Sequence, residues 1–199
     1  SRADLGLKED AFVFCSFNNT FKITPDIFDV WMRILKRTEG SQLWLVELAD
    51  RVKTNFAKEA EKRGVSGDRI VFASHAPYPE HLARHKCADL FLDCFHYNAG
   101  TMASEALWME LPLLTMPGDN FSKRMASSLL TTLGLDELIV PDLKTYEDRA
   151  VALAQNPAEL ARIRDKLSKA KQQSPLFDMA RYTKNLEAAY EQIADRSRK

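Results

Sequence analysis

Short apolar runs of strand character alternate with longer segments of helical character along most of this chain. The apolar runs are residues 12–17, 43–46, 70–73, 90–92, 113–116 and 138–140. The helical segments between them are residues 25–39, 50–63, 80–85, 102–108 and 122–133. Parallel strands need crossover connections, usually helices, which then cover both faces of the sheet. The sequence therefore predicts an α/β fold: a Rossmann-like, mostly parallel sheet in about residues 1–142 and a helical C-terminal segment in residues 143–199.

Local signals mark the ends of the predicted helices. Thr24 offers a capping hydroxyl, Pro25 takes the first helical position and Asp26 places an acid in the first turn. Ser122 is the expected cap of the helix over residues 122–133. Apolar residues at helical spacing predict two amphipathic helices in the C-terminal segment. Their stripes are Leu160, Ile163 and Leu167, and Leu186, Ala189, Tyr190 and Ile193.

Composition limits the classes of partner. The 199 residues suit one large domain, and the 28 basic residues balance the 28 acidic ones. A net charge of zero argues against broad capture of nucleic acid or of an anionic membrane. The chain contains no apolar stretch near the roughly 20 residues that span a bilayer, and residues 1–4 contain no signal-peptide core. Cys15, Cys87 and Cys94 form no CxxC motif, so we expect reduced thiols in a cytoplasmic protein.

The predicted sheet indicates where a ligand binds. In open parallel sheets, ligands bind beyond the carboxyl ends of the strands, at the switch point in strand order. After the first strand, Asn18, Asn19 and Lys22 come just before a helix. Amides and an ammonium group at this place suit phosphate oxygens. The alternative is a turn with a solvated lysine.

The segment after the third predicted strand carries Tyr78, His81 and Arg84. His81 and Arg84 share a helical face and could contact a base or a pyrophosphate, while Tyr78 could stack on a flat ring. His81 and His85 lie four residues apart, which is a conceivable metal pair. Because the chain provides no carboxylate in a recognisable motif beside them, we expect no metal site and expect His85 to face solvent.

The segment after the fourth predicted strand leads into a helix through Gly100, Thr101 and Met102. Free amides and the Thr101 hydroxyl at this helix start form an anion site that suits a pyrophosphate. One turn further on, Glu105 could accept hydrogen bonds from ribose hydroxyls, or it could be only a favourable acid in the first turn.

Missing motifs narrow the chemistry. The chain contains no GxGxxG, no GxxxxGK[ST] and no nucleophile elbow, which disfavours dinucleotide oxidoreductases, P-loop phosphotransferases and α/β hydrolases. Phosphate- and ribose-binding features without a redox or hydrolytic signature point to chemistry in which a nucleoside diphosphate leaves.

Ordered sequence blocks between about residue 2 and residue 193 resemble the O-GlcNAc transferase and Spindly family, as a bacterial-type homologue. The blocks are Phe-Asn-Asn at 17–19, Lys-Ile-Thr-Pro at 22–25, Ala-Pro at 76–77, Glu-His at 80–81 with Arg84, Ala-Asp-Leu-Phe-Leu-Asp at 88–93, Ala-Leu-Trp at 106–108, Leu-Pro at 111–112, Thr-Met-Pro-Gly at 115–118 and Ser-Pro-Leu-Phe at 174–177. The resemblance implies the second, donor-binding lobe of a GT-B glycosyltransferase. In the family, a first catalytic lobe and tetratricopeptide repeats precede this lobe, and we expect both as its partners.

The resemblance also implies roles for individual residues. Lys22 matches the lysine that stabilises the diphosphate leaving group, and Thr101 matches the threonine at the phosphate-binding helix start. Glu105 takes the place of the ribose-binding acid. The remaining donor-contacting positions are Asn18, Asn19, Ala76, Tyr78, His81, Arg84, Gly100 and Met102. The implied reaction is transfer of a sugar to a protein Ser or Thr hydroxyl, with a nucleotide sugar as co-substrate and no cofactor or metal.

Departures from the family pattern leave the donor open. O-GlcNAc transferases usually carry His-Thr-Thr where this chain has Gly100-Thr101-Met102, Asp in place of Glu105 and Lys in place of Tyr78. Glu105 and the Asn pair at 18–19 are closer to Spindly-like members, which use GDP-fucose. UDP-GlcNAc is the default donor. The alternatives are GDP-fucose, an inactive nucleotide-sugar-binding module and an unrelated Rossmann-like interaction domain.

Overall fold

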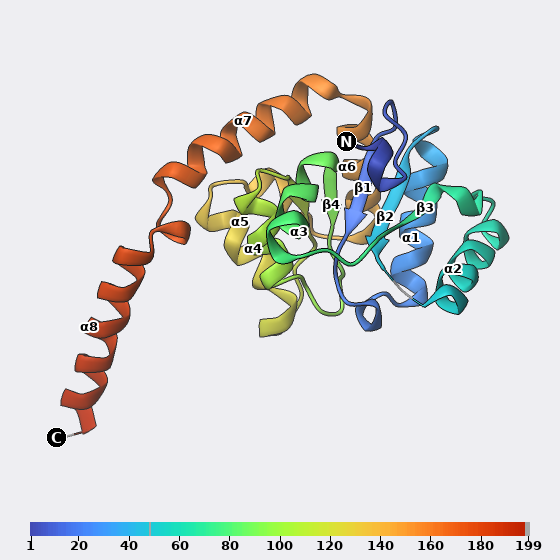
Figure 1. Ribbon diagram of the computed structural model, residues 1–199. Helices are drawn as coiled ribbons and strands as arrows, with labels where there is room; N and C mark the ends of the chain where they lie inside the picture. Colours follow the sequence, from blue (N-terminus) through green and yellow to red (C-terminus); the bar gives the residue numbers. More distant parts are fainter. Residues whose placement is uncertain (48, 198–199) are drawn as a thin grey trace.

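The computed structural model describes residues 1–47 and 49–197 and contains a five-stranded sheet (Figure 1). All neighbouring strands are parallel, and their order is β3-β2-β1-β4-β5. In the central strand, Cys15 pairs with Trp44 on one side and Phe91 on the other. The strands are β1 (Val13–Ser16), β2 (Gln42–Val46), β3 (Ile70–Ala73), β4 (Leu90–Leu92) and β5 (Leu113–Leu114). The predicted parallel α/β sheet is confirmed.

Helices pack against both faces of this sheet, with α3 in front of it and α6 behind it in Figure 1. The helices are α1 (Pro25–Arg37), α2 (Asp50–Lys62), α3 (Tyr78–Arg84), α4 (Thr101–Trp108), α5 (Met125–Thr132), α6 (Leu143–Gln155), α7 (Pro157–Gln173) and α8 (Met179–Ser197). Because right-handed crossovers run outward from β1 in both directions, they place helices on opposite faces.

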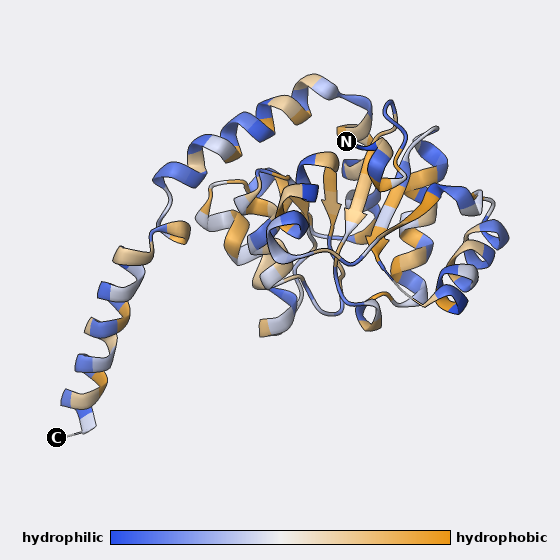
Figure 2. Cartoon of the chain, in the orientation of Figure 1, coloured by the Kyte–Doolittle hydropathy of each residue, from blue (hydrophilic) through white to orange (hydrophobic). Residues whose placement is uncertain are grey.

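The core lies between the sheet and these helices, where the apolar residues gather in Figure 2. Every residue of β1 and β4 is buried, as expected for strands covered on both faces. Trp31 of α1 and Trp44 of β2 are among the largest fully buried side chains. The core residues of α1 match the helical spacing in the sequence, so burial of one face stabilises this helix.

The predicted sixth strand is wrong. Leu138 ends a short 3-10 helix, η6 (Asp136–Leu138), and Ile139 makes only an isolated parallel bridge to Thr115. The amide of Leu138 donates to the carbonyl oxygen of Leu135, and that of Ile139 to Asp136. The segment joins the sheet only at this bridge, where the Thr115 amide donates to the carbonyl oxygen of Leu138 and the Val140 amide donates to that of Thr115.

Of two predicted helix caps, Thr24 takes the cap position of α1 without a capping bond, and Ser122 is wrong. The Thr24 hydroxyl donates to the Asp26 carboxylate and makes no capping bond, although α1 begins at Pro25 as expected. Ser122 lies inside a 3-10 turn, η5 (Phe121–Lys123), whose cap is Asn120. Asn120, two residues before Ser122, therefore caps η5, whereas α5 begins only at Met125 after Arg124, which makes no side-chain capping bond.

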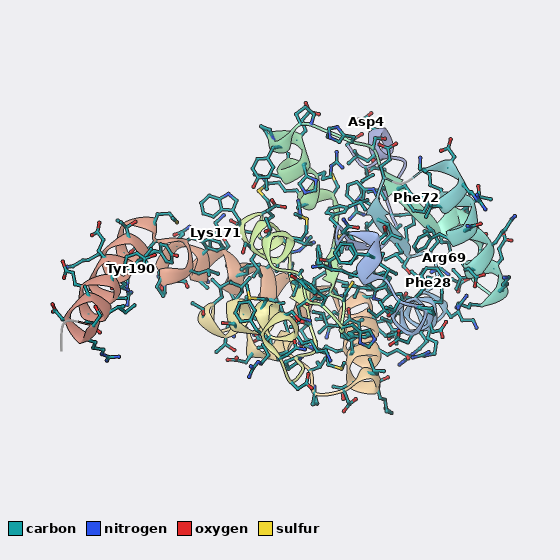
Figure 3. All side chains as sticks on the ribbon, turned by 90° about the horizontal axis from the view of Figure 1, so that it is seen from below. Asp4, Phe28, Arg69, Phe72, Lys171 and Tyr190 are labelled. Atoms are coloured by element: carbon teal, nitrogen blue, oxygen red, sulfur yellow. The ribbon has the colours of Figure 1, made fainter. Side chains whose placement is uncertain are left out.

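The end of the C-terminal segment extends away from the sheet, whereas its first part packs against the core. In α7, the predicted stripe of Leu160, Ile163 and Leu167 is buried. Every residue of α8 is exposed, and this helix extends away from the sheet, with Tyr190 far from the core in Figure 3. The amphipathic pattern of α8 thus predicted the helix correctly, but its apolar side chains have no cover among the described residues.

The thiols behave as expected. All three cysteines are free; Cys15 and Cys94 are buried and Cys87 is partly buried. Burial raises the pKa of the Cys94 thiol, which favours its neutral form. Among the described residues, no helix combines the length and apolarity that crossing a bilayer requires.

Candidate functional site

The switch point of the sheet lies between β1 and β4. From β1 the chain proceeds to β2 on one side, whereas β4 leads to β5 on the other, so the segments after these strands diverge above the same edge. Two adjoining hollows, each of about 550 Å³, lie along this edge and share Val46 and Glu47. The first is lined by Phe17, Asn18, Asn19, Thr20, Lys22, Gly100, Thr101 and Met102, and the second by Ala73, Ser74, His75, Ala76, Pro77, Tyr78, His81 and Arg84.

Lys22 joins the two segments at the switch point. Its Nζ donates a hydrogen bond of 3.0 Å to the carbonyl oxygen of Asn98 and lies 4.1 Å from the centre of the Tyr97 ring. Burial lowers the pKa of Lys22, while the charge of nearby Asp93 opposes this shift. The ammonium group is thus held at the wall of the first hollow. Neither Tyr97 nor Asn98 was among the predicted site residues.

The start of α4 forms the opposite wall of this hollow. The Ser104 amide donates to the carbonyl oxygen of Gly100 at 3.0 Å. The amides of Thr101, Met102 and Ala103 therefore precede the first bond of the helix and are available to a ligand. Together with the positive end of the helix dipole and the Lys22 ammonium, they favour an anion in this hollow.

The asparagines before Lys22 support the turn that carries it. Asn19 caps the 3-10 turn η2 (Thr20–Lys22) by accepting a hydrogen bond from the Phe21 amide. Asn18 is buried, and its amide nitrogen faces Ser16 Oγ at 3.4 Å. Asn18 Oδ1 has no hydrogen-bond partner among the described residues. Asn19 therefore helps to place Lys22, and Asn18 retains one unpaired acceptor.

Asp93 organises the segment after β4. Its carboxylate accepts hydrogen bonds from the amides of Cys94 at 2.8 Å and Ala99 at 2.7 Å, and from the Thr115 hydroxyl at 2.7 Å. Its own carbonyl oxygen accepts from the Tyr146 hydroxyl at 3.1 Å. These bonds fix the backbone of residues 93–100. They therefore also fix the carbonyl oxygen of Asn98, which accepts the hydrogen bond from Lys22. Asp93 was not among the predicted site residues, although an acid directly after a buried strand was an available signal.

We expect Asp93 to make stability depend on pH. Burial raises its pKa to about 7, from 3.8 for an ordinary aspartate. Between these values the folded chain holds one more proton than the unfolded chain, so raising the pH favours unfolding by up to about 4 kcal/mol in total. Urea unfolding of the wild type and Asp93→Asn at about pH 5 and about pH 8 measures this contribution. We expect the variant to gain stability relative to the wild type as pH rises; a constant difference would contradict the assignment.

Arg84 borders the second hollow, but its guanidinium is largely buried. Nη1 donates to the carbonyl oxygen of Ser74 at 2.9 Å, and Nε has no hydrogen-bond partner among the described residues. Burial lowers the pKa of Arg84. This side chain therefore supports the segment after β3 and keeps one donor free. Ala76, also predicted in this segment, lines the same hollow.

Glu105 of α4 approaches α3. Its Oε2 lies 3.3 Å from His81 Nε2, and a hydrogen bond to Glu105 raises the pKa of Tyr78. Glu105 is only 6% exposed, so it is not a solvated first-turn acid. Tyr78 and His81 of α3 thus lie beside Glu105 of α4, and all three were predicted site residues.

The prediction that His85 faces solvent is wrong. Its side chain is buried against the ring of Phe17, with the ring centres 5.1 Å apart. Its Nδ1 lies 3.0 Å from the carbonyl oxygen of His81 and 3.1 Å from that of Leu82. Burial lowers the pKa of His85 to about 4, so the ring is neutral near pH 7.

Residues 1–186 match the family described as glycosyl transferase family 41. The chain belongs to this family. It is 38% identical over 190 residues to the probable UDP-N-acetylglucosamine–peptide N-acetylglucosaminyltransferase SEC of Arabidopsis thaliana, covering 95% of this chain and 19% of the relative. It is 36% identical to the UDP-N-acetylglucosamine–peptide N-acetylglucosaminyltransferase of Caenorhabditis elegans, covering 94% of this chain and 16% of the relative.

A solved structure supports the same assignment. A mutant of the O-GlcNAc transferase of Thermobaculum terrenum matches with a TM-score of 0.86 and 32% identity, over 95% of this chain and 38% of that chain. The match confirms the predicted GT-B glycosyltransferase architecture. The family 41 chain described here thus spans about a fifth or less of the curated relatives and under two fifths of the solved relative.

Proposed function

We propose that this lobe binds the nucleotide-sugar donor of a protein O-GlcNAc transferase, with UDP-GlcNAc as the donor. The single observation that supports this best is the meeting of the Lys22 ammonium and the free amides of α4 at one hollow on the switch point. Two similar relatives carry names that specify UDP-N-acetylglucosamine and a peptide acceptor. The diphosphate of the donor lies in the first hollow, and its nucleoside lies in the second.

The proposed reaction transfers the sugar to a Ser or Thr hydroxyl. The acceptor oxygen bonds to the anomeric carbon as the bond between that carbon and the diphosphate breaks, and the electron pair of that bond stays on the diphosphate. The proton of the acceptor hydroxyl passes to the departing diphosphate, which balances the step. Lys22 and the amides of Thr101 and Met102 face the growing negative charge. Interactions that strengthen as charge develops lower the barrier, so these groups supply the stabilisation without a metal.

The second hollow suits a nucleoside. In this proposal the Glu105 carboxylate accepts hydrogen bonds from ribose hydroxyls, which pair with carboxylates in other nucleotide-binding sheets. Tyr78 is exposed beside Glu105 and offers a ring on which a base can stack. His81 and Arg84 line the same hollow and supply further polar contacts in this proposal.

The acceptor and the remaining catalytic parts come from elsewhere in the protein. The relatives are several times longer than the residues they share with this chain. We propose that a first catalytic lobe and tetratricopeptide repeats face the two hollows and supply the protein acceptor. The lobe alone is therefore expected to bind the donor without turning it over.

A GDP-sugar is the second candidate donor, because Gly100 leaves space at the hollow. A Cβ at this position would approach nothing closer than Met125 Cε at 4.0 Å, and the glycine does not have a left-handed backbone. Backbone geometry therefore does not require glycine here. Its small size instead enlarges the site at a position where O-GlcNAc transferases usually carry histidine, and that leaves room for a different nucleotide.

Thermal unfolding with UDP, GDP and their sugars tests this proposal. A ligand at 100 times its dissociation constant adds about 2.7 kcal/mol, which raises the Tm of a chain of this size by about 5–10 °C. We expect UDP and UDP-GlcNAc to raise the Tm of the wild type, and Glu105→Gln to reduce the rise. A rise with GDP alone would favour the second candidate. The proposal fails if no nucleoside diphosphate changes the Tm.

A further inference from the structure

Two histidines and one glutamate lie close together where α3 and its following turn approach α4. His81, His85 and Glu105 each place one ligand atom so that all of these atoms lie within 4.8 Å of one another. We propose that these three side chains form a binding site for a transition-metal dication such as Zn²⁺. The spacing along the chain suggested only the pair of His81 and His85. Glu105 lies 20 residues or more beyond them and comes beside them only in the folded chain, where its Oε2 lies 3.3 Å from His81 Nε2.

The ligand set matches the preferences of zinc. Two imidazole nitrogens and one carboxylate form an established catalytic zinc set, with an open position for water or another ligand. Imidazole also favours zinc over magnesium and calcium, which prefer oxygen ligands. His81 and His85 lie four residues apart, so successive turns present their rings on the same side.

The orientation of His85 supports this assignment. Its Nδ1 faces the carbonyl oxygens of His81 and Leu82 and donates to them as N–H. With the proton on Nδ1, the lone pair of the neutral ring lies on Nε2, which points to the cluster. A hydrogen bond from the far ring nitrogen to a carbonyl oxygen is the usual support for a metal-binding histidine.

Three buried atoms at this place lack hydrogen bonds. His81 Nε2, His85 Nε2 and Glu105 Oε2 have no hydrogen-bond partner among the described residues. The 3.3 Å separation of His81 Nε2 and Glu105 Oε2 permits an ion pair, but the groups are not aligned for a hydrogen bond. Buried polar atoms are rarely left unpaired, and one cation would satisfy all three atoms.

Zinc and the donor would compete, and this consequence rests on the proposed function. Glu105 and His81 are the groups that we place beside the ribose and base. A cation held by both would occupy the nucleoside position and withdraw the carboxylate from the ribose hydroxyls. Zinc would then act as an inhibitor of donor binding, with no part in the transfer itself.

Calorimetric titration of zinc chloride into the metal-stripped chain tests the site. We expect one Zn²⁺ per chain, and binding weaker by about 100-fold or more in His85→Gln and in Glu105→Gln, because losing a direct ligand costs at least as much as losing a supporting group. Glu105→Gln is nearly isosteric, so it serves as the second variant if His85→Gln fails to fold. Circular dichroism checks the fold of each variant.

His96→Gln is the matched control. His96 Nε2 lies 2.7 Å from Asp26 Oδ2, which makes a half-exposed pair of one histidine and one carboxylate. We expect this variant to bind zinc as the wild type does. The proposal is overturned if the wild type binds no zinc, if both cluster variants bind it equally well, or if only His96→Gln weakens it.

Titration in the presence of UDP separates the two proposals, provided that zinc titrated into UDP alone is used to correct for the zinc that the diphosphate itself binds. Loss of zinc binding in the cluster variants, with weaker zinc binding when UDP is present, supports both the metal site and the nucleoside placement. The same loss without any effect of saturating UDP supports the metal site and contradicts the nucleoside placement. Zinc binding that survives in both cluster variants contradicts the metal site whatever UDP does.

Discussion

Lys22→Ala in a full-length protein that carries this lobe is expected to lower kcat by about 10²–10³-fold, the usual cost of removing one group that stabilises transition-state charge. UDP should bind nearly as well as before, because in the proposed site the α4 amides and the Glu105 region would still hold the nucleotide. Lys22 is suited to this role because the Asn98 carbonyl oxygen and the Tyr97 ring hold its ammonium at the hollow. Steady-state kinetics with UDP-GlcNAc, alongside calorimetry with UDP, separates turnover from binding.

Lys62→Ala provides the matched control for this experiment. Lys62 ends α2 and pairs with Glu59 on the surface. Its removal deletes a lysine of the same size without touching either hollow, so kcat and UDP affinity should not change. Equal losses of turnover and UDP affinity in Lys22→Ala would make Lys22 a ground-state binder and would contradict the proposed role.

Asp93→Ala is expected to lower the free energy of unfolding by about 3–9 kcal/mol. The change leaves the buried amides of Cys94 and Ala99 and the Thr115 hydroxyl without their acceptor. Each unpaired buried polar group costs about 1–3 kcal/mol. Urea unfolding at about pH 6, where the wild-type carboxyl is mostly protonated, measures this loss with little contribution from the buried charge.

Asp93→Asn separates hydrogen bonding from charge. The asparagine oxygen can accept from both amides, and its NH₂ group can donate to Thr115 Oγ, whose hydroxyl then reverses its role. We expect this variant to retain most of the wild-type stability at the same pH. If the alanine and asparagine variants lost equal stability, the hydrogen bonds of Asp93 would not be what fixes residues 93–100.

Local patterns were sufficient for most of the fold. Strands buried on both faces are continuous apolar runs, and α1 shows its buried face directly through Trp31 and its neighbours. The predicted strand over residues 138–140 failed because three apolar residues do not distinguish a strand from the end of a 3-10 turn. There, Ile139 satisfies its amide with the carbonyl oxygen of Asp136. Whether these residues form a strand depends on their hydrogen bonds, which the periodicity of apolar residues does not predict.

The site was partly visible in the sequence for a topological reason. Parallel strands end at one edge, so the segments with Lys22 and Gly100 could be expected near each other before their contacts were known. Asp93, His85 and Glu105 were harder to interpret because burial of a polar side chain depends on which helix packs over it. Spacing alone suggested a solvent-facing His85, whereas packing against Phe17 buries it.

The hydrogen bond that holds Lys22 has an evolutionary consequence, because its acceptor is a main-chain oxygen. Every amino acid at position 98 supplies that oxygen, so no substitution there can delete the acceptor. Mutational sensitivity is transferred to the residues that shape the backbone of the segment, Asp93 above all. Homologous sequences can therefore diverge at the rim of the pocket and still present the ammonium at the same point.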